Sequence, residues 1–137
     1  MTSNKPRIVI DSNVIISALV FGGKPRQVID MLSEDRVSVV IAEDMLTELR
    51  RKISMKFPDF VDDLAVAEGL LKRDGLMVKL GSLNKRVSRD PDDDKFIEAA
   101  ILGACDFVVS GDKDLLTVGS YQGIKIVSTA EFLKIMQ

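Results

Sequence analysis

Carboxylates that follow predicted strands are the residues of this sequence best placed for chemistry. Asp11 comes immediately after a β-branched run at residues 7–10, and Asp112 comes two residues after a second predicted strand at residues 106–110. In an open parallel sheet, ligands bind beyond the carboxyl ends of the strands, so neighbouring strands would bring both acids into one crevice. Each acid also has an ordinary alternative, because aspartate is common at helix caps, as Asp11 would be, and in turns, as Asp112 would be.

A third carboxylate, Glu48, lies at the border of a buried helical stripe. On a predicted helix over residues 42–53 it stands about 60° from Met45 and about 100° from Leu49, at roughly 3.6 residues per turn. A carboxylate at such a border needs a cation. That cation is either a metal ion or, in a structural ion pair, Arg51 or Lys52 one turn further along the helix.

The densest acidic run covers residues 90–94, with the sequence Asp-Pro-Asp-Asp-Asp. Pro91 suits the first position of a helix, and acidic residues in the first turn favour the helix dipole. A helix start explains one or two of these acids but not the whole run, because adjacent carboxylates repel one another. Asp94 stands about 60° from the apolar Ile97 around the helix, and Asp93 is closer still to the buried stripe, so spacing leaves both as candidates.

Two residue counts narrow the chemistry further. The chain has no histidine, which excludes serine–histidine triads, histidine bases and histidine metal ligands. Cys105 is the single cysteine, so there is no intramolecular disulfide, and its small apolar neighbours predict a buried residue. Carboxylates that converge on one cleft bind hard cations such as Mg²⁺ or Mn²⁺. A metal held in this way can activate water and neutralise the charge of a phosphodiester.

The composition is that of an ordinary globular protein. The 137 residues are 46% hydrophobic and 29% charged, and 19 basic against 21 acidic residues give a net charge of −2. The chain is therefore not a polybasic tail, and contact with nucleic acid would have to come from a local patch. The length predicts one domain over residues 1–137, and the lack of a targeting or membrane-spanning segment predicts a cytoplasmic protein with no membrane contact.

Short apolar runs alternate with helical periods along the chain, which predicts an α/β fold. We expect a three-layer α/β/α domain with a central parallel sheet of about five strands. The predicted strands cover residues 7–10, 37–41, 76–78, 106–110 and 124–127. The predicted helices cover residues 14–19, 28–32, 42–53, 60–71, 91–103 and 129–136, with Thr129 as the cap of the last. Residues 111–114 are expected to form a turn, and residues 119–123 a loop.

Four segments together resemble the motifs of PIN domains in their order and spacing. They are Ile-Val-Ile-Asp-Ser-Asn at 8–13, Leu-Thr-Glu-Leu at 46–49, Asp-Lys-Phe-Ile-Glu-Ala-Ala at 94–100, and Val-Val-Ser-Gly-Asp-Lys-Asp-Leu at 108–115. The resemblance runs from about residue 7 to residue 127. It is nearest to the small prokaryotic PIN proteins that are toxin components of toxin–antitoxin pairs.

The resemblance implies a metal-dependent endoribonuclease that hydrolyses single-stranded RNA with Mg²⁺ or Mn²⁺. It implies one acidic quartet for both catalysis and metal binding, made of Asp11, Glu48, Asp94 and Asp112. In this comparison Asp94 is favoured over Asp93, because the acid of the family stands three residues before an apolar residue. Asn13 and Ser110 would support the quartet, Asp114 would help through a water molecule, and Asp93 stays a further candidate.

The resemblance also implies partners. Cations near the acids would hold the RNA, and the candidates are Lys85, Arg86, Arg89 and Arg51. The expected partners are an RNA substrate, a small antitoxin protein and a second copy of the chain in a homodimer. Two alternatives remain open: a stand-alone RNA-processing nuclease, and a non-catalytic interaction module that keeps the fold.

Overall fold

The computed structural model describes residues 5–81 and 93–137, and the centre of this part is a six-stranded sheet. The described strands stand in the order β3-β2-β1-β4-β6-β5. Their bounds are β1 Arg7–Ile10, β2 Ser38–Ala42, β3 Leu76–Val78, β4 Phe107–Val109, β5 Ser120–Tyr121 and β6 Ile124–Val127. All pairs are parallel except β5 with β6, which is antiparallel. The predicted parallel sheet of about five strands is therefore confirmed, with one short antiparallel strand added at its edge.

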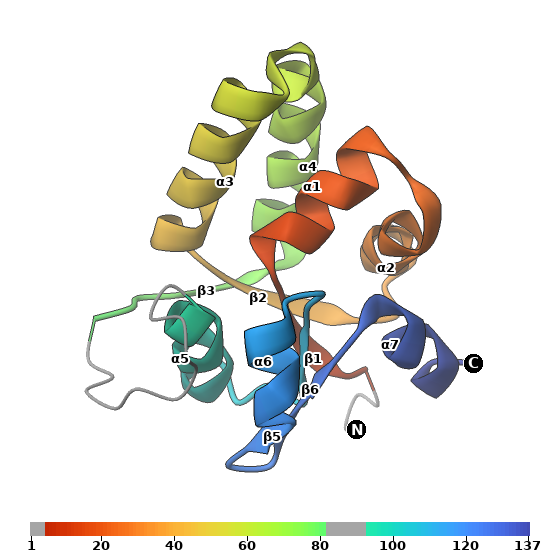
Figure 1. The fold of residues 1–137 in the computed structure, drawn as a ribbon, viewed down its shortest axis with the longest axis vertical. Coiled ribbons are helices and arrows are strands. Elements are labelled where there is room, and N and C mark those ends of the chain that lie inside the picture. Colours follow the sequence, from red (N-terminus) through yellow and green to blue (C-terminus); the bar gives the residue numbers. More distant parts are fainter. Residues whose placement is uncertain (1–4, 82–92) are drawn as a thin grey trace.

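Helices cover both faces of the sheet (Figure 1). Their bounds are α1 Ser12–Val20, α2 Gly23–Ser33, α3 Glu43–Lys56, α4 Val61–Asp74, α5 Asp94–Leu102, α6 Lys113–Val118 and α7 Thr129–Ile135, with a short 3₁₀ helix, η1, at Pro58–Phe60. Buried residues of α1, α2, α4 and α7 and most of those of α3 pack on one face, and those of α5 and α6, together with Met45 of α3, pack on the other. This is the three-layer α/β/α architecture that the sequence predicts.

The first strand shows how the sequence builds the two layers. Successive side chains of a strand point to opposite faces of its sheet. Ile8 and Ile10 accordingly join the core beneath α1 to α4 and α7, whereas Val9 joins the core beneath α5 and α6. All three are at most 1% exposed. Burial of each such side chain contributes roughly 1.5–3 kcal/mol, so these three positions of β1 must be apolar, whereas Arg7 at the start of the strand is exposed.

The order of the strands reverses at β1, which lies between β2 and β4. Ile8, Val9 and Ile10 pair with the three residues of β4, so the carboxyl ends of the two strands are in register. From this edge, β1 leads into α1 on one face and β4 leads into α6 on the other. The two connections therefore diverge, and a crevice at such a point is where open α/β sheets bind ligands. The expected adjacency of these two strands is confirmed.

Three local predictions were wrong. Residues 113–118 form the helix α6 and not only a turn, and residues 120–121 form β5 inside the expected loop. The two glycines at 119 and 123 have φ values of 76° and 83°, which lets the chain turn at each end of this short hairpin segment. The last helix is capped by Ser128 and not by Thr129, because the Ser128 hydroxyl accepts a hydrogen bond from Glu131 N at 3.1 Å.

The remaining predicted helices agree with the structure to within about three residues at each end, except that α2 begins at Gly23 and not at residue 28. The predicted start of the fifth helix, at Pro91, lies outside the described residues. Within the described residues, α5 begins at Asp94. Cys105 is buried, as predicted, and burial raises the pKa of its thiol to about 12. Among the described helices, none has the length and apolar character needed to cross a membrane.

Candidate metal centre

Asp11 is fixed at the carboxyl end of β1 by three hydrogen bonds. Its backbone N–H donates to Val109 O at 2.9 Å, which ties it to the end of β4. Its Oδ1 atom accepts from Asn13 N at 3.0 Å and its Oδ2 atom accepts from the Ser110 hydroxyl at 2.7 Å. The residue is only 3% exposed. Asp11 is thus a helix cap as well as a candidate ligand, and each carboxylate oxygen keeps a lone pair for a second partner.

Ser110 connects Asp11 to the fourth motif. It is fully buried, and while its hydroxyl donates to Asp11, its oxygen accepts a hydrogen bond from Asp112 N at 3.0 Å. Asp112 in turn caps α6, because its Oδ1 atom accepts from Asp114 N at 2.8 Å and from Leu115 N at 3.2 Å. One chain of hydrogen bonds therefore fixes the ends of both strands relative to each other.

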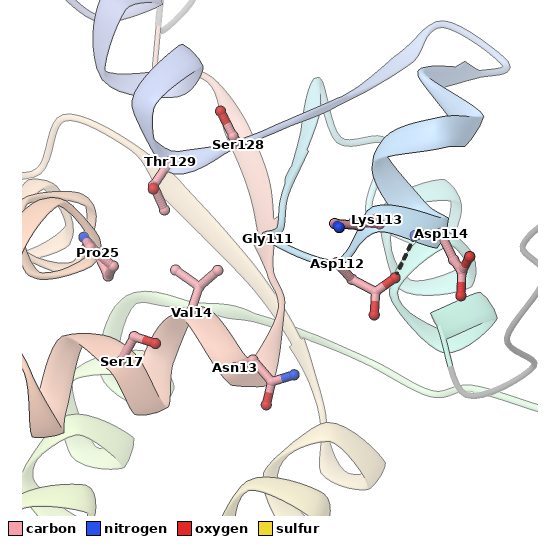
Figure 2. Close-up of a pocket in the computed structure, with 10 residues that line it drawn as sticks. All are labelled: Asn13, Val14, Ser17, Pro25, Gly111, Asp112, Lys113, Asp114, Ser128 and Thr129. Carbon is pink, nitrogen blue, oxygen red and sulfur yellow. Dashed lines mark hydrogen bonds between the residues drawn. The ribbon is translucent and has the colours of Figure 1, made fainter.

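Three carboxylates converge beside this chain. Asp93, Asp112 and Asp114 each place an oxygen so that all three lie within 4.8 Å of one another. Asp93 is buried and the other two are half-buried. In Figure 2, Asp112 and Asp114 lie next to each other at the start of α6, and Asn13 lies across from them on α1. The spacing is suited to a single cation that bridges α5 and α6.

This group contains Asp93, the residue before the third motif, and not Asp94, the first residue of that motif. Asp93 occupies the cap position of α5 and is 6% exposed, whereas Asp94 is the first helical residue and is half-buried. The helical position of Asp93, nearer the buried stripe, explains the difference. Within the described residues, the group of three also leaves out Asp11 and Glu48.

Glu48 lies on α3 and is neutralised by two lysines. Lys52, one turn further along α3, approaches it to 3.2 Å, and Lys95 of α5 forms a second ion pair with its other oxygen. Lys52 Nζ also lies 3.5 Å from Asn13 Oδ1. Of the two local partners that the sequence suggested for Glu48, Lys52 forms the pair and Arg51 is exposed. The sequence analysis expected a cation beside Glu48, and the ammonium groups of Lys52 and Lys95 provide it.

Lys95 lies beside the candidate centre, and the sequence analysis did not single it out. Its side chain is 19% exposed, and burial lowers its pKa while the charges of Asp11 and Asp44 oppose that shift. Its Nζ atom also lies 5.3 Å from the centre of the Phe96 ring. The only signal in the sequence was a cation inside the third motif, directly after Asp94.

An open pocket of about 590 Å³ adjoins Asp112 and Asp114 (Figure 2). Its other lining residues come from α1, from the start of α2, and from the first residues of α6 and α7 with the segments before them: Asn13, Val14, Ser17, Pro25, Gly111, Lys113, Ser128 and Thr129. Lys113 is exposed on this wall. The pocket thus combines hydroxyl groups, one amide and one ammonium beside the acidic group.

The predicted RNA contacts are only partly described. Lys85, Arg86 and Arg89 lie outside the described residues. Arg51 is exposed on α3, one position before Lys52. Its neighbour Arg50 forms ion pairs with Glu68 at 2.7 Å and with Glu43 at 3.2 Å. Arg50 therefore links α3 to α4. Those two carboxylates raise the pKa of Arg50 above its usual value.

Comparison with known proteins agrees with this geometry. Residues 7–114, which contain all four motif acids, match the PIN domain family. This chain belongs to the PIN-domain family. PIN domains are generally nucleases, and the acidic group found here stands where the strand order reverses. The chain is also similar to the uncharacterized protein MJ1680 of Methanocaldococcus jannaschii, with 30% identity over 122 residues that cover 86% of this chain and 78% of the relative.

Proposed function

We propose that this PIN domain is an endoribonuclease that hydrolyses phosphodiester bonds of single-stranded RNA with Mg²⁺ or Mn²⁺. The convergence of Asp93, Asp112 and Asp114 within 4.8 Å carries the proposal. At that separation two like charges repel by about 3 kcal/mol at an effective dielectric constant of about 20. A divalent cation turns this repulsion into coordination, and carboxylate oxygens are the ligands that Mg²⁺ and Mn²⁺ prefer.

The proposed metal-binding and catalytic residues come from all four motifs. They are Asp11, Glu48, Asp94 and Asp112. Asp93, directly before the third motif, is the alternative to Asp94, and its place in the acidic group favours it. Asn13 and Ser110 would hold Asp11 in place, through the hydrogen bonds already described. Asp114 stands within the acidic group and would act through a water molecule. This set contains only oxygen donors, so it suits a hard cation and not zinc.

The metal would supply an activated water and neutralise charge on the scissile phosphate. The chain itself would do the positioning. Asp11 and Asp112 are held by backbone N–H groups and by Ser110, so their carboxylates keep fixed directions as substrate enters. With no histidine in the chain, Asp114 is the carboxylate we propose as acceptor for the proton of the attacking water.

The pocket beside the acidic group would receive the RNA chain. Lys113 stands on its wall, where an ammonium would contact a backbone phosphate, and Ser17 and Thr129 offer hydroxyls to sugar or phosphate oxygens. Arg51 on α3, together with Lys85, Arg86 and Arg89, would add further phosphate contacts. Binding through such cations would weaken as salt rises.

We further propose that the protein is the toxin of a toxin–antitoxin pair and forms a homodimer. Three large apolar side chains, those of Phe21, Met55 and Val66, are each more than 70% exposed. Val66 also lines a groove of about 370 Å³ between α1, α2 and α4. Exposed apolar surface of this kind supports a protein partner. A stand-alone RNA-processing nuclease would use the same catalytic site.

The test is cleavage of a fluorescent single-stranded RNA of mixed sequence by the purified protein with Mn²⁺, with Mg²⁺ or with EDTA. Asp11→Asn and Asp112→Asn remove one charge each at the two strand ends, and Lys134→Gln on the distant α7 is the control variant. We expect cleavage that requires metal and that both aspartate variants lose while they remain folded by circular dichroism. Equal cleavage in EDTA, or by the Asp11→Asn variant, would refute the proposal.

A further inference from the structure

The ion pair between Glu48 and Lys95 crosses the sheet edge at the candidate centre. Glu48 belongs to α3, which packs mainly on one face of the sheet, and Lys95 belongs to α5 on the other face. Their side chains are 14% and 19% exposed, so both charges are largely removed from water. Removing a lysine from water is unfavourable unless an anion faces it. The placement of Lys95 is therefore tied to the acids around it.

Arg50, also on α3, forms ion pairs that have a structural role and serve as a comparison. Arg50 joins Glu43 and Glu68, its side chain is 41% exposed, and both of its partners lie on α3 and α4. That bridge links two helices that already pack together. The pair of Lys95 differs in using Glu48, a proposed metal ligand, and in lying within the electrostatic reach of Asp11.

We propose that Lys95 is an internal counter-ion of the metal centre, which positions Glu48 in the metal-free protein and competes with the divalent ion for it. This inference rests on the proposed function, because it assumes that Glu48 becomes a ligand. An ammonium and a metal ion cannot occupy the same face of the Glu48 carboxylate. Metal binding on the face that Lys95 occupies would therefore break the contact between Lys95 and Glu48, and the free energy of that contact would be subtracted from the free energy of metal binding.

Lys52 does not make Lys95 redundant. It reaches Glu48 along a single helix, and it is also shared with Asn13 at 3.5 Å. Among the described ion pairs of Glu48, the one with Lys95 links it to α5, the helix that begins beside Asp93. Lys95 thus restrains the carboxylate from the side on which the other candidate ligands stand. Loss of Lys95 would leave Glu48 paired within its own helix and free to turn toward a cation.

The experiment measures Mn²⁺ affinity by calorimetry or electron paramagnetic resonance for the full chain without RNA. Lys95→Met keeps the length of the side chain and removes its charge, and we expect it to bind Mn²⁺ about tenfold more tightly, or about 1.4 kcal/mol. Lys95→Arg keeps the charge and should bind like the parent protein. Lys134→Met removes an equal charge from the distant α7 and controls for the general loss of positive charge.

A double-mutant cycle ties the effect to Glu48. In a Glu48→Gln background, Lys95→Met should change the Mn²⁺ affinity by less than about twofold, because the competing contact is already gone. The metal-free Lys95→Met protein should also melt at a lower temperature, and Mn²⁺ should raise its melting point by more than in the parent. If Lys95→Met fails to fold, Lys95→Gln provides the same test.

The outcomes separate this inference from the proposed function. Tighter binding by Lys95→Met that disappears in the Glu48→Gln background would support the counter-ion role. Equal affinities of the parent and Lys95→Met, or an equal gain from Lys134→Met, would overturn it and leave the nuclease proposal standing. Failure of the parent protein to bind Mn²⁺ at all would overturn both.

Discussion

Replacing Ser110 with alanine removes the hydroxyl that joins the two strand ends of the candidate centre. Ser110 is fully buried, donates to Asp11 Oδ2 at 2.7 Å and accepts from Asp112 N at 3.0 Å. The substitution deletes one oxygen atom, so any cavity is small. Its main effect is to leave a buried carboxylate oxygen and a backbone N–H without this partner.

The magnitude follows from these two bonds. A hydrogen bond to a charged group contributes about 1.5–3 kcal/mol, and one between neutral groups about 0.5–1.5 kcal/mol. Asp11 is 3% exposed, so water cannot readily replace the lost donor. We expect Ser110→Ala to lower the free energy of unfolding by about 2–4 kcal/mol. For a chain of this size that is roughly 6–12 °C in the melting temperature.

Metal affinity provides the second readout. Residues that orient a metal ligand typically change affinity by about 10–100-fold when they are removed. We therefore expect Mn²⁺ binding by Ser110→Ala to weaken by at least about tenfold. Ser128→Ala is the matched control, because it deletes the hydroxyl that caps α7 and costs about 1 kcal/mol without touching Asp11. A Ser110→Ala protein that melts within about 2 °C of the parent and binds Mn²⁺ equally well would refute this account of the site.

Three further predictions test other parts of the structure. Asp93→Asn should weaken Mn²⁺ binding more than Asp94→Asn, because only the former belongs to the three-carboxylate group; the reverse order by calorimetry would return the role to Asp94. Gly103→Ala should lower the free energy of unfolding in urea by about 1–3 kcal/mol, since its Cβ atom would stand 2.6 Å from the Val40 side chain; an unchanged midpoint would contradict that packing. Cys105 should resist iodoacetamide at pH 8 until the protein is unfolded, because burial raises its thiol pKa to about 12. Its folded pKa exceeds the usual 9.0, so its share of stability is present below pH 9 and is lost as pH rises toward 12, a loss that Cys105→Ala should not show.

Strand-end logic explains how much of the site could be predicted from the sequence. Asp11 and Asp112 were found because short apolar runs end directly before them, and parallel strands bring such ends to one edge. Glu48 could be predicted because its angle around the helix places it at the border of the buried stripe. Its side chain is 14% exposed, which agrees with that position. These inferences depend on periodicity alone, and they needed no knowledge of which helix faces which.

Contacts between distant segments explain what could not be predicted. The pairing of Glu48 with Lys95 joins residues 47 positions apart on opposite faces of the sheet, and no local pattern encodes it. Asp93 and Asp94 differ by only about 20° in their angle to Ile97, which is less than the uncertainty in where a helix begins. Helix α6 was missed because Leu115 is its one buried residue, too few to create a helical period.

The two halves of the centre have opposite charge balances, and this difference suggests an order of assembly. Around α6, Asp93, Asp112 and Asp114 gather negative charge, with backbone N–H groups as the described donors to Asp112. Around α3, Glu48 is already neutralised by Lys52 and Lys95. A divalent cation arriving from solvent would therefore meet the attractive field of these carboxylates first. Glu48 would join only when the contact with Lys95 is exchanged for the metal, so the α3 side would complete a centre that the α6 side begins.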